Sequence, residues 1–217
     1  MANCRIICAA FGAFELQPGE LPVLIDTLRA ASTIVTALAR GVRRILLLPE
    51  GRQPQDYDTR DLLTIGESGG RQLPGFEAGN SPAALVDILA RNPRDTIVMK
   101  TSNLTRLLAG LDRAVICSSM NVQAVAAYCA GKDTCIIAAG GSRGQAEDLG
   151  VALALAAIMG GADFDPDALA SCVRESEHAR HLQSLGFQAD IDYIAGSGQY
   201  AVVPVYDGSE IRKVNHP

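Results

Sequence analysis

The 217-residue sequence lacks several features that would place it in a specialised class of protein. Its longest apolar run, Val151–Met159, is well short of the roughly 20 residues that cross a bilayer, and it suits a buried helix instead. Basic residues are not in excess, because 19 Lys and Arg face 24 Asp and Glu for a net charge of -5. The sequence therefore predicts no membrane span and no nonspecific nucleic-acid binding.

Export signals, metal-binding cysteine pairs and repeats are also missing. The N-terminus has no charged segment followed by a long apolar stretch and a cleavage site, so we expect a cytoplasmic location. The six cysteines contain no Cys-x-x-Cys pair and lie mostly in apolar stretches, which predicts buried free thiols. No linker or fixed-period repeat divides the chain, so residues 1–217 are expected to form a single domain.

Short runs rich in Val, Ile and Leu recur along the chain and are typical of buried strands. They are Arg5–Ala10, Leu21–Ile25, Arg44–Leu48, Thr96–Met99, Ala114–Cys117, Thr134–Ala138 and Tyr200–Val205. Helical patterns separate several of these runs. This alternation indicates a layered α/β fold, with a mostly parallel or mixed sheet flanked by helices.

Three further segments have a predicted conformation. A helix that is apolar nearly all round is expected at Gln145–Met159, covered on more than one side. Glu50–Asp61 and Glu67–Asn80 have the glycines, prolines and scattered charges of loops. Asp190–Val214 is expected to form strands with a turn at Asp207-Gly208 and to add antiparallel strands at the edge of the sheet.

Asp26 follows a predicted strand, and Arg29 lies in the first turn of the helix that comes next. Ligands of open α/β sheets bind at such strand ends, where the Asp26 carboxylate could hold a cation. A basic side chain is unfavourable at a helix N-terminus, so Arg29 is expected to face an anion. The alternative is structural: Asp26 caps the helix and Arg29 pairs with a surface carboxylate.

Two polar, glycine-containing segments follow other predicted strands. Gly66-Glu67 opens a glycine-rich stretch that ends in Asn80-Ser81-Pro82, where Ser81 has the position of a helix N-cap. Glu67 is the expected ligand there, although turn chemistry alone also explains the pattern. The second segment contains Ser102, Asn103 and Thr105, whose backbone and hydroxyl groups suit a phosphate or a plain helix cap.

The fourth candidate segment, Ala139-Gly140 to Glu147-Asp148, joins a strand to a helix that opens with two carboxylates. Adjacent helical residues point about 100° apart, so one of the two is expected to face the site. Acidic residues also stabilise a helix N-terminus without any ligand. His178 and His181, three residues apart, are expected on a surface helix with no metal-binding role.

These segments together are similar to those of one known family. The matching motifs are Asp26 to Ile34, Gly66-Glu67 leading into Gly75 to Pro82, Glu147-Asp148, Leu185 to Phe187, Asp190 to Tyr193 and Val203 to Val205. In this order they resemble the 2-phosphosulfolactate phosphatases over most of the chain. The resemblance implies an α/β fold, a cytoplasmic location and Mg²⁺-dependent release of phosphate from 2-phosphosulfolactate, on the route to coenzyme M.

The resemblance and the strand-end positions suggest a role for each candidate residue. Mg²⁺ is expected on Asp26, Glu67 and one of Glu147 and Asp148, because hard cations take oxygen ligands. Asp26, Arg29 and Glu67 form the expected catalytic group. The substrate's phosphate is expected to contact Arg29, Ser32, Thr33, Asn80, Ser102, Asn103 and Thr105.

Two departures from the family pattern concern the substrate. Ser68 stands where the family has Arg, and Leu104 stands where it has Gly. The leading hypothesis is a phosphatase for a small acidic phosphomonoester. The alternative is an impaired or repurposed member that binds an anionic small molecule. A homo-oligomer is among the expected forms.

The sequence leaves two mechanisms of phosphoryl transfer open. Asp26 could attack phosphorus as a nucleophile. However, Asp26-Thr27-Leu28 lacks the second Asp of the Asp-x-Asp pattern of haloacid-dehalogenase-type enzymes. Attack by metal-activated water is therefore the preferred hypothesis.

Overall fold

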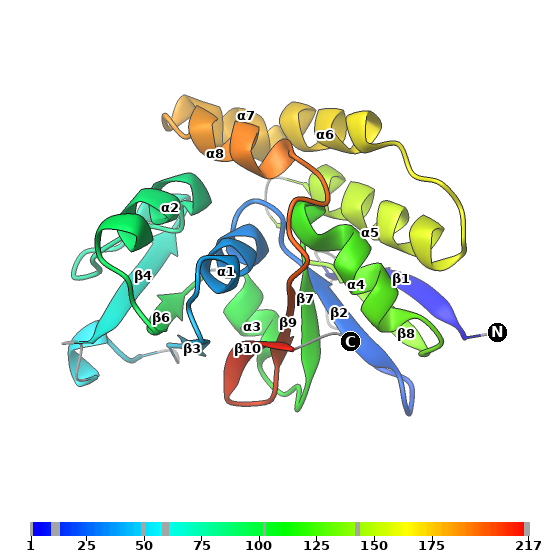
Figure 1. Cartoon of the computed structure of the whole chain (residues 1–217), viewed down its shortest axis with the longest axis horizontal. Coiled ribbons are helices and arrows are strands. Elements are labelled where there is room, and N and C mark those ends of the chain that lie inside the picture. The colour runs from blue at the N-terminus through cyan, green and yellow to red at the C-terminus, as the bar shows by residue number, and fades with distance from the viewer. Residues whose placement is uncertain are drawn as a thin grey trace.

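The apolar runs assemble into one mixed sheet in the computed structural model (Figure 1). The structure describes residues 2–9, 14–48, 51–57, 61–101, 103–141 and 144–214, and within these ranges the sheet has ten strands. In spatial order they are β1 (Cys4–Cys8), β8 (Thr134–Ala138), β2 (Leu21–Ile25), β7 (Ala114–Cys117), β9 (Val203–Tyr206), β10 (Glu210–Val214), β3 (Arg44–Leu47), β6 (Thr96–Lys100), β4 (Leu62–Ser68) and β5 (Arg71–Gln72). The predicted α/β class is confirmed.

Helices cover both faces of the sheet. They are α1 (Ala30–Ala39), α2 (Pro82–Arg91), α3 (Leu104–Leu108), α4 (Val122–Cys129), α5 (Ala146–Met159), α6 (Pro166–Glu175), α7 (Glu177–Ser184) and α8 (Gln188–Ala195), with 3₁₀ turns η2 (Pro54–Asp56) and η3 (Ser119–Asn121). Strand β2 shows how the faces differ, because successive side chains of a strand point to opposite sides. Leu24 packs in the core that contains α1, whereas Val23 and Ile25 pack in the core that contains α4 and α5.

The sheet consists of two parallel groups joined by an antiparallel hairpin. Strands β1, β8, β2 and β7 are parallel to one another, and so are β3, β6 and β4. The hairpin β9–β10 lies between the groups and pairs antiparallel with β7 and with β3. Because the pairs β7–β9, β9–β10 and β10–β3 are all antiparallel, the two groups run in opposite directions.

Helices α6, α7 and α8 lie together along one end of the molecule, at the top of Figure 1. We call them the helical cap. Leu182 of α7 and Ile191 of α8 belong to a third apolar core, which also contains Leu28 and Val35 of the β2–α1 region. The cap is therefore packed directly against the segment that carries Asp26 and Arg29.

The segment Asp190–Val214 corrects one prediction. It begins inside helix α8, and only Val203–Tyr206 and Glu210–Val214 form strands, on either side of the predicted Asp207-Gly208 turn. Ile191, Ile194 and Ala195 are buried with the spacing of one helical face, so the apolar pattern here is helical. The two strands also lie inside the sheet and not at its edge.

The Glu67–Asn80 segment is not entirely loop. Its start belongs to β4, a strand that the sequence analysis missed, and it continues into β5 after a tight turn at Gly69-Gly70. Gly66 interrupts the apolar pattern of β4, and the Phe76 ring lies so close to it that a side chain there would collide.

Two other predictions concern cysteines and membranes. All six cysteines are free, as predicted, but only Cys117, Cys129 and Cys135 are fully buried, whereas Cys4 is exposed. In the part of the chain that the structure describes, no helix is long and apolar enough to cross a membrane.

Candidate active site

A cavity of about 190 Å³ lies where the ends of four strands meet the helical cap. Asp26 follows β2, Glu67 ends β4, Asn103 comes after β6, and Gly140 follows β8. The full lining is Asp26, Leu28, Arg29, Ala30, Glu67, Gly69, Gly70, Asn80, Asn103, Gly140, Gly141, Gly144, His178 and Leu182. The structure thus brings most of the predicted segments together at one place, as the strand-end argument required.

Asp26 is a buried carboxylate in an acidic environment. Its backbone C=O accepts the N–H of Ala31, which starts helix α1. Burial, together with the nearby charges of Glu67 and Glu147, raises the pKa of the Asp26 carboxyl to about 6, while His178 and the backbone N–H of Ala30 act in the opposite direction. Such a group remains mostly ionised at neutral pH, and among the described residues it has no ion pair that would compensate its buried charge.

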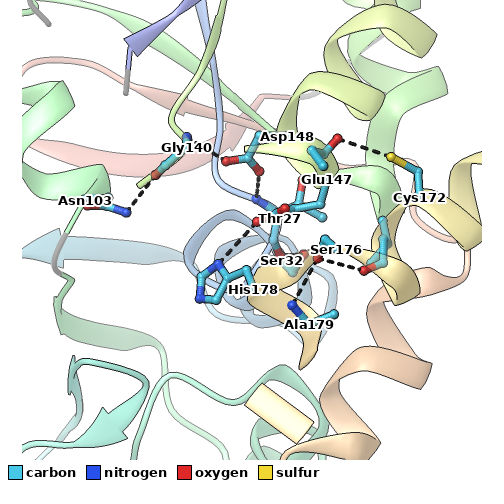
Figure 2. A network of polar contacts seen from close by, with 12 residues as sticks. Thr27, Ser32, Asn103, Gly140, Glu147, Asp148, Cys172, Ser176, His178 and Ala179 are labelled. Atoms are coloured by element: carbon cyan, nitrogen blue, oxygen red, sulfur yellow. Dashed lines mark hydrogen bonds and ion pairs between the residues drawn. The ribbon is translucent and has the colours of Figure 1, made fainter. Parts of the chain in front are cut away.

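Asp148 holds two strand ends in place (Figure 2). One carboxylate oxygen accepts the backbone N–H of Thr27 at 2.7 Å, and the other accepts the backbone N–H of Gly140 at 2.9 Å. Burial and the neighbouring charges of Glu147 and Asp26 raise its pKa well above the ordinary value, against the effect of these two bonds. Both oxygens are thereby engaged in fixing the β2 and β8 ends relative to each other.

Glu147 and His178 form a contact between helices α5 and α7, also drawn in Figure 2. The His178 Nδ1 lies 3.2 Å from Glu147 Oε1. The second oxygen, Oε2, is buried without a hydrogen-bond partner. His178 lines the cavity, so the expectation of a plain surface helix is wrong for this residue. Its partner lies 31 positions away, and no local pattern marks the pair.

Arg29 is buried at the start of α1 and faces an anion that belongs to the protein itself. Its guanidinium donates to Asp190 of α8 at 2.7 Å and to the carbonyl of Gly70 at 2.6 Å. The same group lies 4.1 Å from the centre of the Phe187 ring, a cation–π arrangement. The partner carboxylate is buried, in contrast to the surface carboxylate of the structural alternative.

The two asparagines of the site differ in their partners. Asn103 donates from Nδ2 to the carbonyl of Gly140 at 3.0 Å, which links the two parallel groups of strands. Asn80 is 3% exposed, and its Oδ1 has no hydrogen-bond partner. An unpartnered buried amide is costly, and at the wall of a cavity it is available to a ligand.

Three of the predicted phosphate ligands are not among the residues that line the cavity. Ser32 donates to the carbonyl of Thr27, Thr33 donates to the carbonyl of Arg29, and both are buried in α1. Thr105 contacts Thr101 at 3.2 Å. These hydroxyls have bonds that stabilise local structure. Ser102 lies outside the described residues.

The chemistry of the acidic side chains fits a hard divalent cation. Among the described residues, no three Asp, Glu, His or Cys side chains are already arranged around a common metal position. Mg²⁺ does not require such a cage, because it keeps several waters and binds through one or two carboxylates. Asp26 and Glu67 line the cavity and can provide these oxygens, whereas Glu147, whose charge acts on Asp26, is buried beside the cavity and is not one of its lining residues.

Comparison with known proteins identifies one family. Residues 13–209 match the family model described as 2-phosphosulpholactate phosphatase. A 2-phosphosulfolactate phosphatase of Methanothermobacter thermautotrophicus is 33% identical over 227 residues, which cover 94% of this chain and 97% of that protein. Proteins named as probable 2-phosphosulfolactate phosphatases are 31% identical in Symbiobacterium thermophilum (91% and 95% covered) and in Gloeobacter violaceus (90% and 93%). The resemblance found in the sequence is confirmed, and this chain belongs to the 2-phosphosulfolactate phosphatase family.

Proposed function

We propose that this protein is a Mg²⁺-dependent phosphatase that hydrolyses a small acidic phosphate monoester, with 2-phosphosulfolactate as the first candidate substrate. The relatives named above support the activity. The observation that carries the metal dependence is the group of acidic side chains at and beside the cavity: Asp26 and Glu67 line it, and Glu147 Oε2, buried beside it, has no hydrogen-bond partner among the described residues. An anionic phosphate would be repelled from this site unless a cation neutralised it first.

Asp26, Glu67 and Glu147 are the residues that would hold the cation. Asp148 is less suited, because each of its oxygens already accepts a backbone N–H, which fixes the carboxylate towards Thr27 and Gly140. When bound, Mg²⁺ supplies neutralisation of the phosphate oxygens and activation of water. Hydrolysis of phosphate monoesters is among the slowest uncatalysed reactions, so the site needs both effects.

The remaining residues of the cavity orient the substrate. The glycines at 140, 141 and 144 leave room for a phosphate to approach the backbone. Asn80 offers an unpartnered amide, and Arg29 is held rigidly in the wall by Asp190. In this proposal Asp148 is a positioning residue, because it fixes the backbone at Thr27 and Gly140 without touching the substrate.

The test is phosphate release from purified, metal-free protein. We expect no release from 2-phosphosulfolactate in the presence of chelator and full activity after addition of Mg²⁺. Glu147→Gln should lower the affinity for Mg²⁺ in this assay, whereas Glu175→Gln, an exposed carboxylate of α6, should not. Activity that is equal with and without Mg²⁺ would contradict the metal dependence.

A binding-only protein is distinguished in the same preparation. Stabilisation by phosphate in a thermal-shift measurement, without turnover of any phosphoester in a panel of short-chain compounds, would favour the impaired or repurposed alternative. Turnover of other compounds in the panel, but not of 2-phosphosulfolactate, would support the phosphatase activity and assign it a different substrate.

A further inference from the structure

A second cavity, of about 240 Å³, adjoins the first one. We call it the side chamber. It lies between the β4–β5 hairpin, helix α2 and the start of α8, and it shares Arg29, Gly70 and Asn80 with the first cavity. A substrate whose phosphate lies in the first cavity would therefore extend a neighbouring group past these three residues into the chamber.

Much of the lining of the side chamber is polar. The polar or charged side chains are those of Arg29, Gln72, Glu77, Asn80 and Ser81. The one cation among these lining residues is paired with the buried carboxylate of Asp190, and the lining also contains one anion. The charge around the chamber is therefore not positive, and a second acidic group of a substrate finds no unmatched cation among the lining residues.

Three side-chain donors of the chamber already have acceptors inside the protein. Arg29 and Ser81 both donate to Asp190, at 2.7 and 2.6 Å. Gln72 donates from Nε2 to the Phe76 carbonyl at 2.6 Å. A carboxylate or a sulfonate accepts hydrogen bonds and donates none. These engaged donors therefore do not favour such a group in the chamber.

Asn80 differs from the other polar residues of the lining. Its side chain is buried, and among the described residues its Oδ1 has no hydrogen-bond partner. The neighbouring backbone is fixed, because Ser81 caps α2 and donates to Asp190 of the helical cap. A buried acceptor without a partner costs free energy, and a ligand group that donates to it recovers this cost. Since Asn80 belongs to both cavities, that donor would lie next to the phosphate.

We infer that the side chamber binds a hydroxyl group of the substrate, which donates a hydrogen bond to Asn80 Oδ1. The inference rests on the proposed phosphatase activity and deepens it: among small acidic phosphate monoesters, the protein favours those with a hydroxyl on the carbon next to the ester carbon. The acidic group stays beside the phosphate in the first cavity, where the cation of the proposed function offsets both charges. Asn80 is thus a specificity-determining residue for the alcohol part of the ester.

The test compares 2-phosphoglycerate with 2-phospholactate, each as both enantiomers, in the presence of Mg²⁺. The two compounds carry the same phosphate and carboxylate, and they differ in one hydroxyl group. A site that binds a substrate hydroxyl rejects the analogue without it, because the buried polar group of the site is then left unpaired. We expect kcat/KM for the preferred enantiomer of 2-phosphoglycerate to exceed that for 2-phospholactate by about tenfold or more.

Substitution of Asn80 assigns this preference to one residue. Asn80→Leu keeps the size of the side chain and removes its acceptor, so it should bring the ratio towards one. Asn92→Leu is the matched control, because Asn92 lies at the other end of α2, is exposed and lines neither cavity. If Asn80→Leu does not fold, Asn80→Ala takes its place with the same expected effect. The affinity for Mg²⁺, measured by calorimetry, should be similar in all these proteins.

Two outcomes would overturn the inference: a ratio near one in the unsubstituted protein, or an unchanged ratio in Asn80→Leu. An unchanged ratio with a lowered affinity for Mg²⁺ would assign Asn80 to the cation instead. If only other phosphoesters are hydrolysed, the two compounds are compared as inhibitors, with the same preference expected.

If no phosphoester is hydrolysed, the proposed function fails, and the chamber is tested separately. The two compounds are then stable ligands, and calorimetry measures their affinities for the protein. Equal affinities would refute the role of the chamber.

Discussion

Two buried groups of charges, one on each side of the cavity, differ in whether their charges are matched. On one side Arg29 and Asp190 form a pair at 2.7 Å, and both side chains are almost completely buried. On the other side Asp26, Glu147 and Asp148 are buried together, and among the described residues the basic side chain in contact with them is His178. The charges of the first group are matched within the protein. The charges of the second group would be matched by the cation of the proposed function, so the two groups separate residues that support the fold from residues that we propose bind a ligand.

The largest expected effect comes from removing a charge on the unmatched side. Asp26→Asn should reduce phosphatase activity by about a thousandfold or more, because a group that stabilises the transition state electrostatically is lost. The fold should be retained, since the substitution removes an uncompensated buried charge. Activity and thermal unfolding of this variant are to be compared with those of Asp163→Asn, an exposed carboxylate. An active Asp26→Asn protein would remove this residue from the site.

Substitutions in the matched group, Arg29 and Asp190, should change the free energy of unfolding. Asp190→Ala leaves the Arg29 guanidinium buried without its partner, which costs about 3–5 kcal/mol of unfolding free energy. The double variant Arg29→Met with Asp190→Ala should be less destabilised than the sum of the two single variants. Urea unfolding of the three variants measures this difference. A loss below about 1 kcal/mol in Asp190→Ala would show that the pair does not support the fold.

The two sides should also differ in their response to pH. Burial raises the pKa of Asp26 to about 6, above the ordinary 3.8, so the ionised form is disfavoured in the folded protein. Stability attributable to this group is therefore lowest above pH 6 and increases as the pH falls from about 6 towards 4, by roughly 3 kcal/mol at most.

The measurement uses metal-free protein with chelator present. Because the charges of His178, Glu67 and Glu147 act on the same group, the result is the difference in unfolding free energy between the unsubstituted protein and Asp26→Asn over this range. A difference that is independent of pH would contradict the raised pKa.

The smallest effect concerns the link between the matched pair and helix α2. Ser81 caps this helix by accepting the backbone N–H of Ala84, and its hydroxyl donates to Asp190. Ser81→Ala should cost about 1 kcal/mol. The loss of unfolding free energy caused by Ser81→Ala should be smaller in the Asp190→Ala background, since the hydrogen bond from Ser81 to Asp190 is absent there. Equal costs in both backgrounds would mean that the two residues act independently.

The sequence predicted the location of the site better than the partners within it. Asp26 and Glu67 each lie at the end of a strand, where ligands of α/β proteins bind, so the sequence marked both positions. Their convergence is a property of the whole sheet, because β2 and β4 belong to two groups that run in opposite directions. The position of Arg29 at a helix start predicted an anion nearby, but the anion is Asp190, 161 positions away. No local pattern contains a contact over such a separation.

The sequence analysis missed strand β4 and helix α8, because the residues of each are compatible with more than one conformation. Strand β4 contains Gly66 and ends in polar residues, so its composition is that of a loop, and only its pairing with β6 shows it to be a strand. In α8 the apolar residues Ile191 and Ile194 also suit a strand. Packing against the rest of the cap decides between the two conformations.

The hairpin β9–β10 has a consequence for how the molecule is made. It is formed by residues 203–214, after every other strand in the chain, yet it occupies the middle of the sheet between β7 and β3. During synthesis the earlier strands leave the ribosome before this hairpin does. Until β9 and β10 follow, these strands form two separate groups, and the edge strands β7 and β3 have no strand to pair with on that side. Such edges invite wrong pairing until they are filled. The cavity, which draws on both surfaces, is accordingly among the last features that a newly made chain acquires.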